Sequence, residues 1–221
     1  MSHCAVLWDM DGTIVNSIPF HTLAWQETFS KRGRKFTDTD AEWVNGRKNE
    51  IIIPYILGQG LSPEEVARIA KEKEATYRRL VKDSIKPLPG VVELIKSMTA
   101  AQFQLAIVSS TPKENIELII KTLGIKKYFS LFINGDDVTE GKPSPQGFLL
   151  AANKLGVEPK NCVVMEDAIV GVRAAKRGGM YCIAVANTCS KKDIAEADIV
   201  VNSLEEITVK MVEGLLTSPK K

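Results

Sequence analysis

Two aspartates, Asp9 and Asp11, lie directly after a short apolar run and directly before Gly12. One carboxylate can attack phosphorus as a nucleophile, while the other gives and takes the proton of the leaving group. Carboxylate oxygens are also ligands that Mg²⁺ prefers. The pair therefore indicates magnesium-dependent phosphoryl transfer, and a calcium loop or a plain turn is the alternative interpretation of this short string by itself.

The same pattern, an apolar run closed by polar side chains, recurs further along the chain. Ser109 follows the run 103–108, and Glu166 and Asp167 follow the run 162–165. Lys142 belongs to a Gly-Lys-Pro-Ser-Pro segment. A phosphomonoester is anionic and its transition state spreads charge over the equatorial oxygens, so cations and hydroxyl donors are the side chains it requires.

These residues need elements that bring them together. Strand-like runs at 4–8, 103–108, 131–133, 162–165 and 181–185 alternate with amphipathic helical stretches at 89–100, 111–123 and 144–155. This alternation predicts an α/β fold with a Rossmann-like, doubly wound parallel sheet. Ligands bind at the carboxyl ends of the strands in such sheets, which is where the polar clusters lie. Thr111-Pro112 and Ser144-Pro145 are interpreted as an N-cap followed by a first-turn proline.

The segment 17–86 interrupts the alternation. It contains helix-like stretches at 18–31, 50–57 and 62–82, the last with Ser62, Pro63 and Glu65 arranged as a capping box. We therefore expect a core domain formed by 1–16 and 87–221, with a helical cap domain, 17–86, inserted after the first strand. Hinges are expected near 15–18 and 84–88.

The order of these motifs resembles the haloacid dehalogenase (HAD) superfamily of phosphohydrolases, in the form with a helical cap. The resemblance extends from Val6 to about Val200 and rests on four motifs, which are Asp9-Met10-Asp11-Gly12-Thr13, Ser109, Lys142, and Glu166-Asp167 followed by Gly171. It implies that Asp9, Asp11, Ser109 and Lys142 are catalytic, with Asp9 as nucleophile and Asp11 as acid and base. It also implies Mg²⁺ as the cofactor, held by Asp9, Asp167 and the Asp11 carbonyl, with Glu166 acting directly or through water. A dehalogenase of this superfamily lacks the second aspartate, which argues against halide removal.

Within the superfamily, the insert is similar to the beta-phosphoglucomutase and sugar-phosphate phosphatase branch. The similarity implies substrate contacts from His21, Lys73, Gly46, Arg47, Ser110 and Thr111. Two positions depart from the mutase pattern, because Pro112 replaces a lysine and Asn49 replaces an arginine that would hold a second phosphate. Arg47, Lys48 and Lys113 could form a shifted grip.

The departures favour a Mg²⁺-dependent phosphatase that hydrolyses a small phosphorylated metabolite, a sugar phosphate, through an aspartyl-phosphate on Asp9. The alternative is a beta-phosphoglucomutase-like hexose-phosphate mutase. A third interpretation, a non-catalytic binding module on the same fold, would be expected if members of the motif were missing, and none is.

Composition sets limits on partners. The 221 residues include 29 basic and 27 acidic side chains, a formal net charge of +2, which argues against charge-driven binding of nucleic acid. No apolar run approaches the roughly 20 residues of a membrane span. The four cysteines show no zinc or redox spacing, and no signal peptide is visible. We expect a cytoplasmic monomer whose partner is a small phosphomonoester.

Overall fold

The computed structural model describes residues 4–217, and its strands form one six-stranded parallel sheet in the order β3-β2-β1-β4-β5-β6. The strands are β1 (Ala5–Trp8), β2 (Gln104–Val108), β3 (Leu131–Ile133), β4 (Cys162–Glu166), β5 (Tyr181–Val185) and β6 (Ile199–Val201). Because β1 pairs in parallel with both β2 and β4, the carboxyl ends of these three strands meet at one edge. The predicted doubly wound α/β fold is confirmed.

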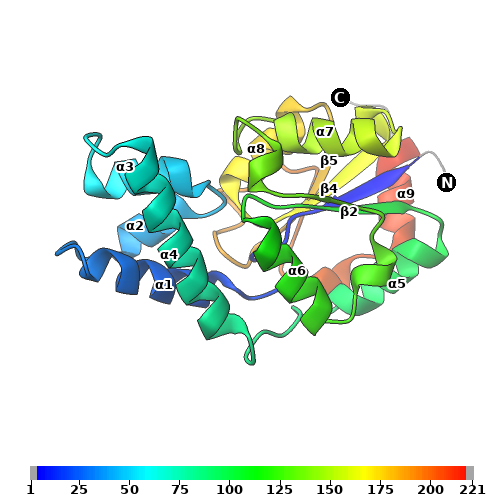
Figure 1. Ribbon diagram of the computed structural model, residues 1–221. Coiled ribbons are helices and arrows are strands. Elements are labelled where there is room, and N and C mark those ends of the chain that lie inside the picture. The colour runs from blue at the N-terminus through cyan, green and yellow to red at the C-terminus, as the bar shows by residue number, and fades with distance from the viewer. Residues whose placement is uncertain (1–3, 218–221) are drawn as a thin grey trace.

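Helices cover both faces of the sheet (Figure 1). Side chains alternate across a strand, so Val6 and Trp8 enter one hydrophobic core while Ala5 and Leu7 enter the other. The first core is closed by α5 (Val91–Ala100), α6 (Lys113–Thr122) and α9 (Val209–Thr217), and the second by α7 (Gln146–Leu155) and α8 (Ile169–Arg177). Both faces of the sheet are therefore covered, and its central strands are buried, which explains their near-continuous apolar sequences.

Four helices separate β1 from α5 in the chain, and we call them the insert. They are α1 (Ile18–Ser30), α2 (Asp38–Val44), α3 (Asn49–Leu57) and α4 (Pro63–Val81). The insert packs around its own hydrophobic cluster, in which the rings of Trp25 and Phe29 stack with centroids 4.9 Å apart. In Figure 1 it lies to one side of the sheet.

The two connections between the insert and the sheet run side by side. Val15 forms an antiparallel bridge with Pro87, and the Leu88 N–H donates to the Ile14 carbonyl at 2.9 Å. Both predicted hinge segments meet at this bridge. The division into a core domain and a cap domain, 17–86, stays a prediction.

Helix starts differ in part from expectation. Ser62 and Glu65 form the predicted capping box at α4. At α6 and α7 the prolines themselves, Pro112 and Pro145, occupy the N-cap position. Ser144 Oγ still accepts the N–H of Gln146, the first residue of α7, at 3.4 Å. No side chain caps α6, so the predicted threonine cap is wrong. The Thr111 hydroxyl is instead bonded to Ser109.

Three helices, α2, α8 and α9, and one strand, β6, are absent from the sequence-based prediction. Only Asp40 of α2 is buried, so the helix has no apolar stripe to reveal it, and β6 is three residues long. In the described part of the chain, every helix is either too short or too polar to cross a bilayer.

Candidate active site

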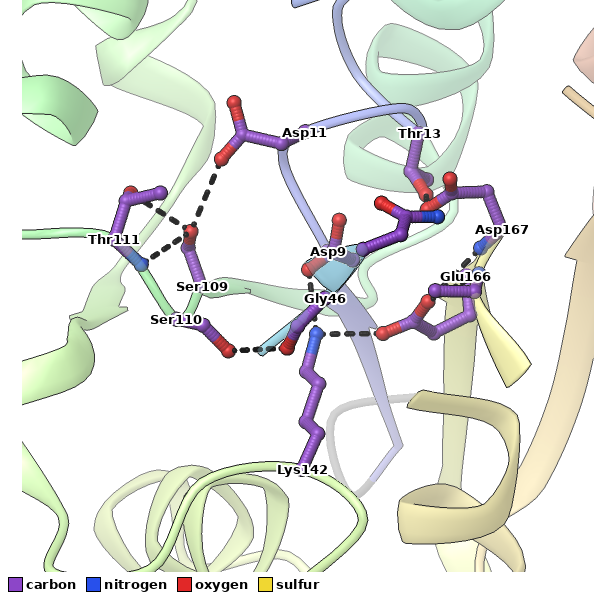
Figure 2. A network of polar contacts seen from close by, with 12 residues as sticks. Asp9, Asp11, Thr13, Gly46, Ser109, Ser110, Thr111, Lys142, Glu166 and Asp167 are labelled. Carbon is purple, nitrogen blue, oxygen red and sulfur yellow. Dashed lines mark hydrogen bonds and ion pairs between the residues drawn. The ribbon is translucent and has the colours of Figure 1, made fainter. Parts of the chain in front are cut away.

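Asp9 follows β1, and its backbone N–H donates to the Met165 carbonyl of β4 at 2.9 Å. This bond places Asp9 beside the two acidic residues at the end of β4, Glu166 and Asp167. One oxygen of each of the three carboxylates lies within 4.8 Å of the others, and all three residues are buried. Figure 2 shows the three side chains converging from the two neighbouring strands. The sequence predicted this convergence.

Three adjacent buried carboxylates repel one another and lose hydration. Burial raises the pKa of Asp9, while the nearby Lys142 ammonium opposes that rise. Burial, with the charge of Glu166, raises the pKa of Asp167 to about 7. A cation bound among these oxygens would relieve both effects, since buried charge is tolerated when it is paired or coordinates a metal.

Lys142 supplies one such cation from the loop before α7. Its Nζ lies 2.5 Å from Asp9 Oδ1 and 2.5 Å from Glu166 Oε1. Although burial disfavours the charged ammonium, the Asp9 and Glu166 carboxylates raise the pKa of Lys142. One monovalent cation against three carboxylates leaves the cluster suited to a hard divalent ion with oxygen ligands.

The second oxygen of Glu166 is bound to backbone. Glu166 Oε2 accepts the N–H groups of Asp167 and Ala168 at 2.9 and 3.0 Å, just before α8 begins. The Asp167 side chain does not cap this helix, because Ala168 is the N-cap residue and the Glu166 carboxylate accepts the N–H groups at this end.

Asp167 is held by two hydroxyl groups. Thr13 Oγ1 donates to Oδ1 at 3.1 Å, and Thr188 Oγ1 donates to Oδ2 at 2.5 Å. The approach requires a glycine at position 12, where a Cβ would lie 2.2 Å from Asp167 Oδ2 and where φ is +93°. Gly12 therefore does more than turn the chain, since it makes room for the third carboxylate.

The Asp11 side chain points away from the three-carboxylate cluster. Its Oδ1 accepts hydrogen bonds from Ser17 Oγ at 2.5 Å and from the His21 ring at 3.1 Å, with the Tyr77 hydroxyl at 3.4 Å. Although burial opposes ionisation, His21 and Ser17 lower the pKa of Asp11. Asp11 is thus held as a carboxylate, and its predicted metal contact through the backbone carbonyl stays a prediction.

His21 joins Asp11 to Lys73. Lys73 Nζ lies 2.8 Å from His21 Nδ1 and 2.8 Å from Glu74 Oε1. An ammonium only donates, so Nδ1 accepts and Nε2 carries the hydrogen that Asp11 receives. His21 and Lys73 both line the cavity above Asp9, but Lys73 is 2% exposed and already neutralised by Glu74.

The loop after β2 forms another wall of this cavity. Ser109 Oγ lies 2.9 Å from Thr111 Oγ1 and 3.5 Å from Asp11 Oδ2, and Ser110 Oγ donates to the Gly46 carbonyl at 2.9 Å (Figure 2). Arg47 lines the cavity from the insert, with its guanidinium 4.5 Å from the Trp43 ring centre. All six predicted substrate-binding residues therefore line one cavity, which also contains Asp9, Asp11 and Asp167.

Sequence reasoning missed several residues that orient this site, namely Ser17, Asn45, Glu74 and Thr188. The sequence offered a sign of Thr188, because this residue lies in the loop after β5, at the same end of the sheet as Asp9 after β1. The other three lie on or beside helices of the insert, where a polar side chain is usually solvated and gives no sequence signal.

The sequence is similar to those of known phosphatases, which agrees with this geometry. Residues 5–179 match the family model of haloacid dehalogenase-like hydrolases. Validoxylamine A 7'-phosphate phosphatase of Streptomyces hygroscopicus subsp. limoneus is 31% identical, over 91% of this chain and 94% of its own length. Fructose-1-phosphate phosphatase of Escherichia coli is 32% identical, over 83% of this chain and 96% of its own length.

A solved structure is similar across the whole fold. Beta-phosphoglucomutase of Clostridium difficile superposes with a TM-score of 0.87 at 26% identity, covering 96% of each chain. The chain belongs to the haloacid dehalogenase-like hydrolase family. The prediction that it is an enzyme of the phosphoric monoester hydrolase class is confirmed.

Proposed function

We propose that this protein is a Mg²⁺-dependent phosphatase that hydrolyses a sugar phosphate through an aspartyl-phosphate on Asp9. The observation that carries the proposal is the buried cluster of Asp9, Glu166 and Asp167, with Lys142 bonded to Asp9. A carboxylate cannot readily approach an anionic phosphate, and cations on both sides of Asp9 remove that obstacle.

Asp9, Asp167 and the Asp11 carbonyl would hold the magnesium ion, with Glu166 beside them or bound through water. The donor set fits, because it consists of oxygen atoms only and carries more negative charge than Lys142 can neutralise. The bound ion would supply a Lewis acid that withdraws charge from a phosphoryl oxygen.

In the first step an Asp9 carboxylate oxygen forms a bond to phosphorus and the bond from phosphorus to the leaving oxygen breaks. Asp11 gives its proton to that oxygen, Lys142 stabilises the charge that develops, and the Ser109 hydroxyl donates to a phosphoryl oxygen. In the second step water attacks phosphorus, its proton passes to Asp11, and the bond between phosphorus and Asp9 breaks.

The resting contacts of Asp11 refine this sequence. Ser17 and His21 favour its ionised form, which suits the second step, in which Asp11 accepts a proton from water. For the first step Asp11 has to take up a proton as the substrate binds. Ser17 Oγ and His21 Nε2, which both donate to the Asp11 carboxylate, hold it where it can exchange that proton.

The sugar-phosphate assignment is supported by the relatives, one named for fructose 1-phosphate, and by the cavity. The insert contributes an amide group, Asn49, and an aromatic ring, Trp25, to the lining of the cavity. An amide suits the hydroxyl groups of a sugar, and a ring suits its C–H faces. The insert acts as the cap that excludes water during transfer.

The second candidate is a hexose-phosphate mutase, favoured by the structural similarity to beta-phosphoglucomutase. A mutase must hold a second phosphate, and here Lys73 is neutralised by Glu74 and Pro112 offers no donor. Incubation with beta-glucose 1-phosphate and a bisphosphate primer separates the two. Glucose 6-phosphate would establish the mutase, while inorganic phosphate without it would establish the phosphatase.

The proposal is tested by Asp9→Asn, with exposed Asp83→Asn as the matched control. In saturating Mg²⁺, Asp9→Asn should reduce release of phosphate from a panel of sugar phosphates to background, and the control should retain the wild-type rate. Near-normal turnover by Asp9→Asn would exclude Asp9 as the nucleophile.

A further inference from the structure

The two oxygens of Asp167 are held by different threonines. Thr13 donates to Oδ1 from the turn after β1, and Thr188 donates to Oδ2 from the loop after β5. Each carboxylate oxygen has two lone pairs, so both can still face a cation. The hydroxyl groups therefore fix the rotation of the carboxylate without blocking it.

Thr188 also touches the insert. Asn45 Nδ2 lies 2.9 Å from Thr188 Oγ1. An amide nitrogen only donates, so the Thr188 oxygen accepts from Asn45 and its single hydrogen must go elsewhere. Two acceptors are in reach, Asp167 Oδ2 at 2.5 Å and the Asp167 backbone carbonyl at 3.0 Å. The bond from Asn45 restricts the rotation of the hydroxyl, and in this arrangement the carboxylate is the nearer acceptor.

Gly46, the residue after Asn45, contacts the end of the sheet at which the strands' carboxyl ends meet. The Gly46 carbonyl accepts from Ser110 Oγ at 2.9 Å, and a Cβ on Gly46 would lie 2.8 Å from Val170. The turn formed by Asn45 and Gly46 thus lies against the loop after β2, the start of α8 and the loop after β5. This turn belongs to the insert, so the contacts exist only while the insert lies against the sheet.

We propose that Thr188 is a positioning residue for Asp167, and that Asn45 makes this positioning depend on contact between the insert and the sheet. The inference rests on the proposed function, in which Asp167 is a metal ligand. When the insert moves away, Asn45 leaves Thr188, the hydroxyl is free to turn to the backbone carbonyl, and Asp167 loses a fixed orientation. Closure of the insert therefore tightens the hold on magnesium.

Calorimetric titration of the substrate-free, full-length protein with Mg²⁺ tests the first part. Thr188→Val should weaken Mg²⁺ binding about 10- to 100-fold, the usual cost of removing a partner of a metal ligand. Thr188→Ser keeps the hydroxyl and should restore affinity. Thr99→Val is the matched control, because Thr99 bonds within α5, outside the active-site cavity. Wild-type affinity in Thr188→Val would overturn the proposal.

A double-mutant cycle tests the second part. Asn45→Ala should weaken Mg²⁺ binding about 2- to 30-fold in the wild-type background, the usual range for coupling between sites. It should have no further effect in Thr188→Val, because Asn45 acts through that hydroxyl. Additive losses would refute the coupling, and melting temperatures measured alongside show that each variant is folded.

The titration separates this inference from the proposed function. If the wild type binds Mg²⁺ and releases phosphate while Thr188→Val binds Mg²⁺ equally well, the inference fails and the phosphatase stands. If Asp167→Ala leaves Mg²⁺ binding unchanged, the metal site itself is wrong and the proposed function fails with it.

Discussion

The Glu166 carboxylate fills the space in which a side chain on residue 171 would begin. A Cβ on Gly171 would lie 1.8 Å from Glu166 Oε1. The same carboxylate accepts two backbone N–H groups and pairs with Lys142, so it cannot move aside without losing those bonds. Gly171, on the first turn of α8, is therefore part of what holds the acidic cluster in place.

Gly171→Ala should accordingly disrupt both stability and activity. The added methyl group must displace Glu166 or shift α8, and overpacking of this kind costs about 1–3 kcal/mol. Phosphatase turnover should fall with it, because Lys142 loses one of its two carboxylate partners. Urea unfolding and kcat measure the two effects. Gly60→Ala is the control, since nothing lies within 4 Å of a Cβ there, and equal behaviour of the two variants would contradict the prediction.

The stability of the metal-free protein should depend on Asp167 as pH changes. The folded-state pKa of about 7 lies above the ordinary value of 3.8, so the folded protein binds this proton more tightly than the unfolded chain does. The contribution of the Asp167 proton to the free energy of unfolding is fully present below pH 3.8 and is lost as pH rises through about 7.

Melting temperatures between pH 4.5 and 8.5 in a chelator check this. The wild type should lose stability relative to Asp167→Asn as pH rises, and Mg²⁺ added at pH 8 should stabilise the wild type but not Asp167→Asn. A constant difference between the two proteins across the range would show that Asp167 does not titrate there. Exposed Asp83→Asn should follow the wild type.

Lys142→Met should impair catalysis and folding together. Methionine is similar in length and apolar beside the Phe148 ring, over which the Lys142 ammonium lies, but it leaves Asp9 and Glu166 without their cation. Breaking a buried ion pair costs about 3–5 kcal/mol, and loss of a charge that stabilises the transition state lowers kcat about 10²- to 10³-fold. Lys160→Met, at a side chain that is 68% exposed, should change neither. Wild-type kcat in Lys142→Met would remove Lys142 from the mechanism.

Asn115 connects the insert to α6, one of the helices that cover the sheet. Its amide donates to Glu74 Oε2 at 2.6 Å and accepts from Arg78 at 2.9 Å, both on α4. Asn115→Ala leaves these partners unsatisfied and should destabilise the protein by about 1–3 kcal/mol in denaturant titrations. Asn153→Ala on the exposed side of α7 should be neutral. If both variants unfold alike, the link between α4 and α6 contributes nothing.

Much of the site could be predicted because parallel strands share one edge. Asp9, Ser109 and Asp167 each follow an apolar run, and strand pairing brings the ends of those runs together. Lys142 follows no strand, and only the resemblance to a family of known enzymes assigned it. Its position between Asp9 and Glu166 depends on how a long loop folds over the sheet.

The residues that orient the site could not be found in this way. Thr188 and Asn45 are 143 positions apart, and Glu74 and Asn115 are 41 apart on different helices. Such pairs depend on side-chain geometry across the junction between the insert and the sheet, which no local pattern encodes. The resemblance also implied a direct substrate contact for Lys73, whose ammonium is bonded to His21 and Glu74, and this contact stays a prediction. A monomeric state and a cytoplasmic location stay predictions.

The bridge between Val15 and Pro87 has a consequence for how such a chain can change. The chain enters and leaves the insert at this one bridge, so the ends of the insert lie side by side. A longer, shorter or unrelated segment joined at that bridge would leave the order of the strands unaltered. Asp9, Glu166 and Asp167 lie outside the exchanged stretch of the gene, whereas His21 and Asn45 lie inside it, so recombination there would conserve the acidic cluster and replace the side chains that contact Asp11 and Thr188.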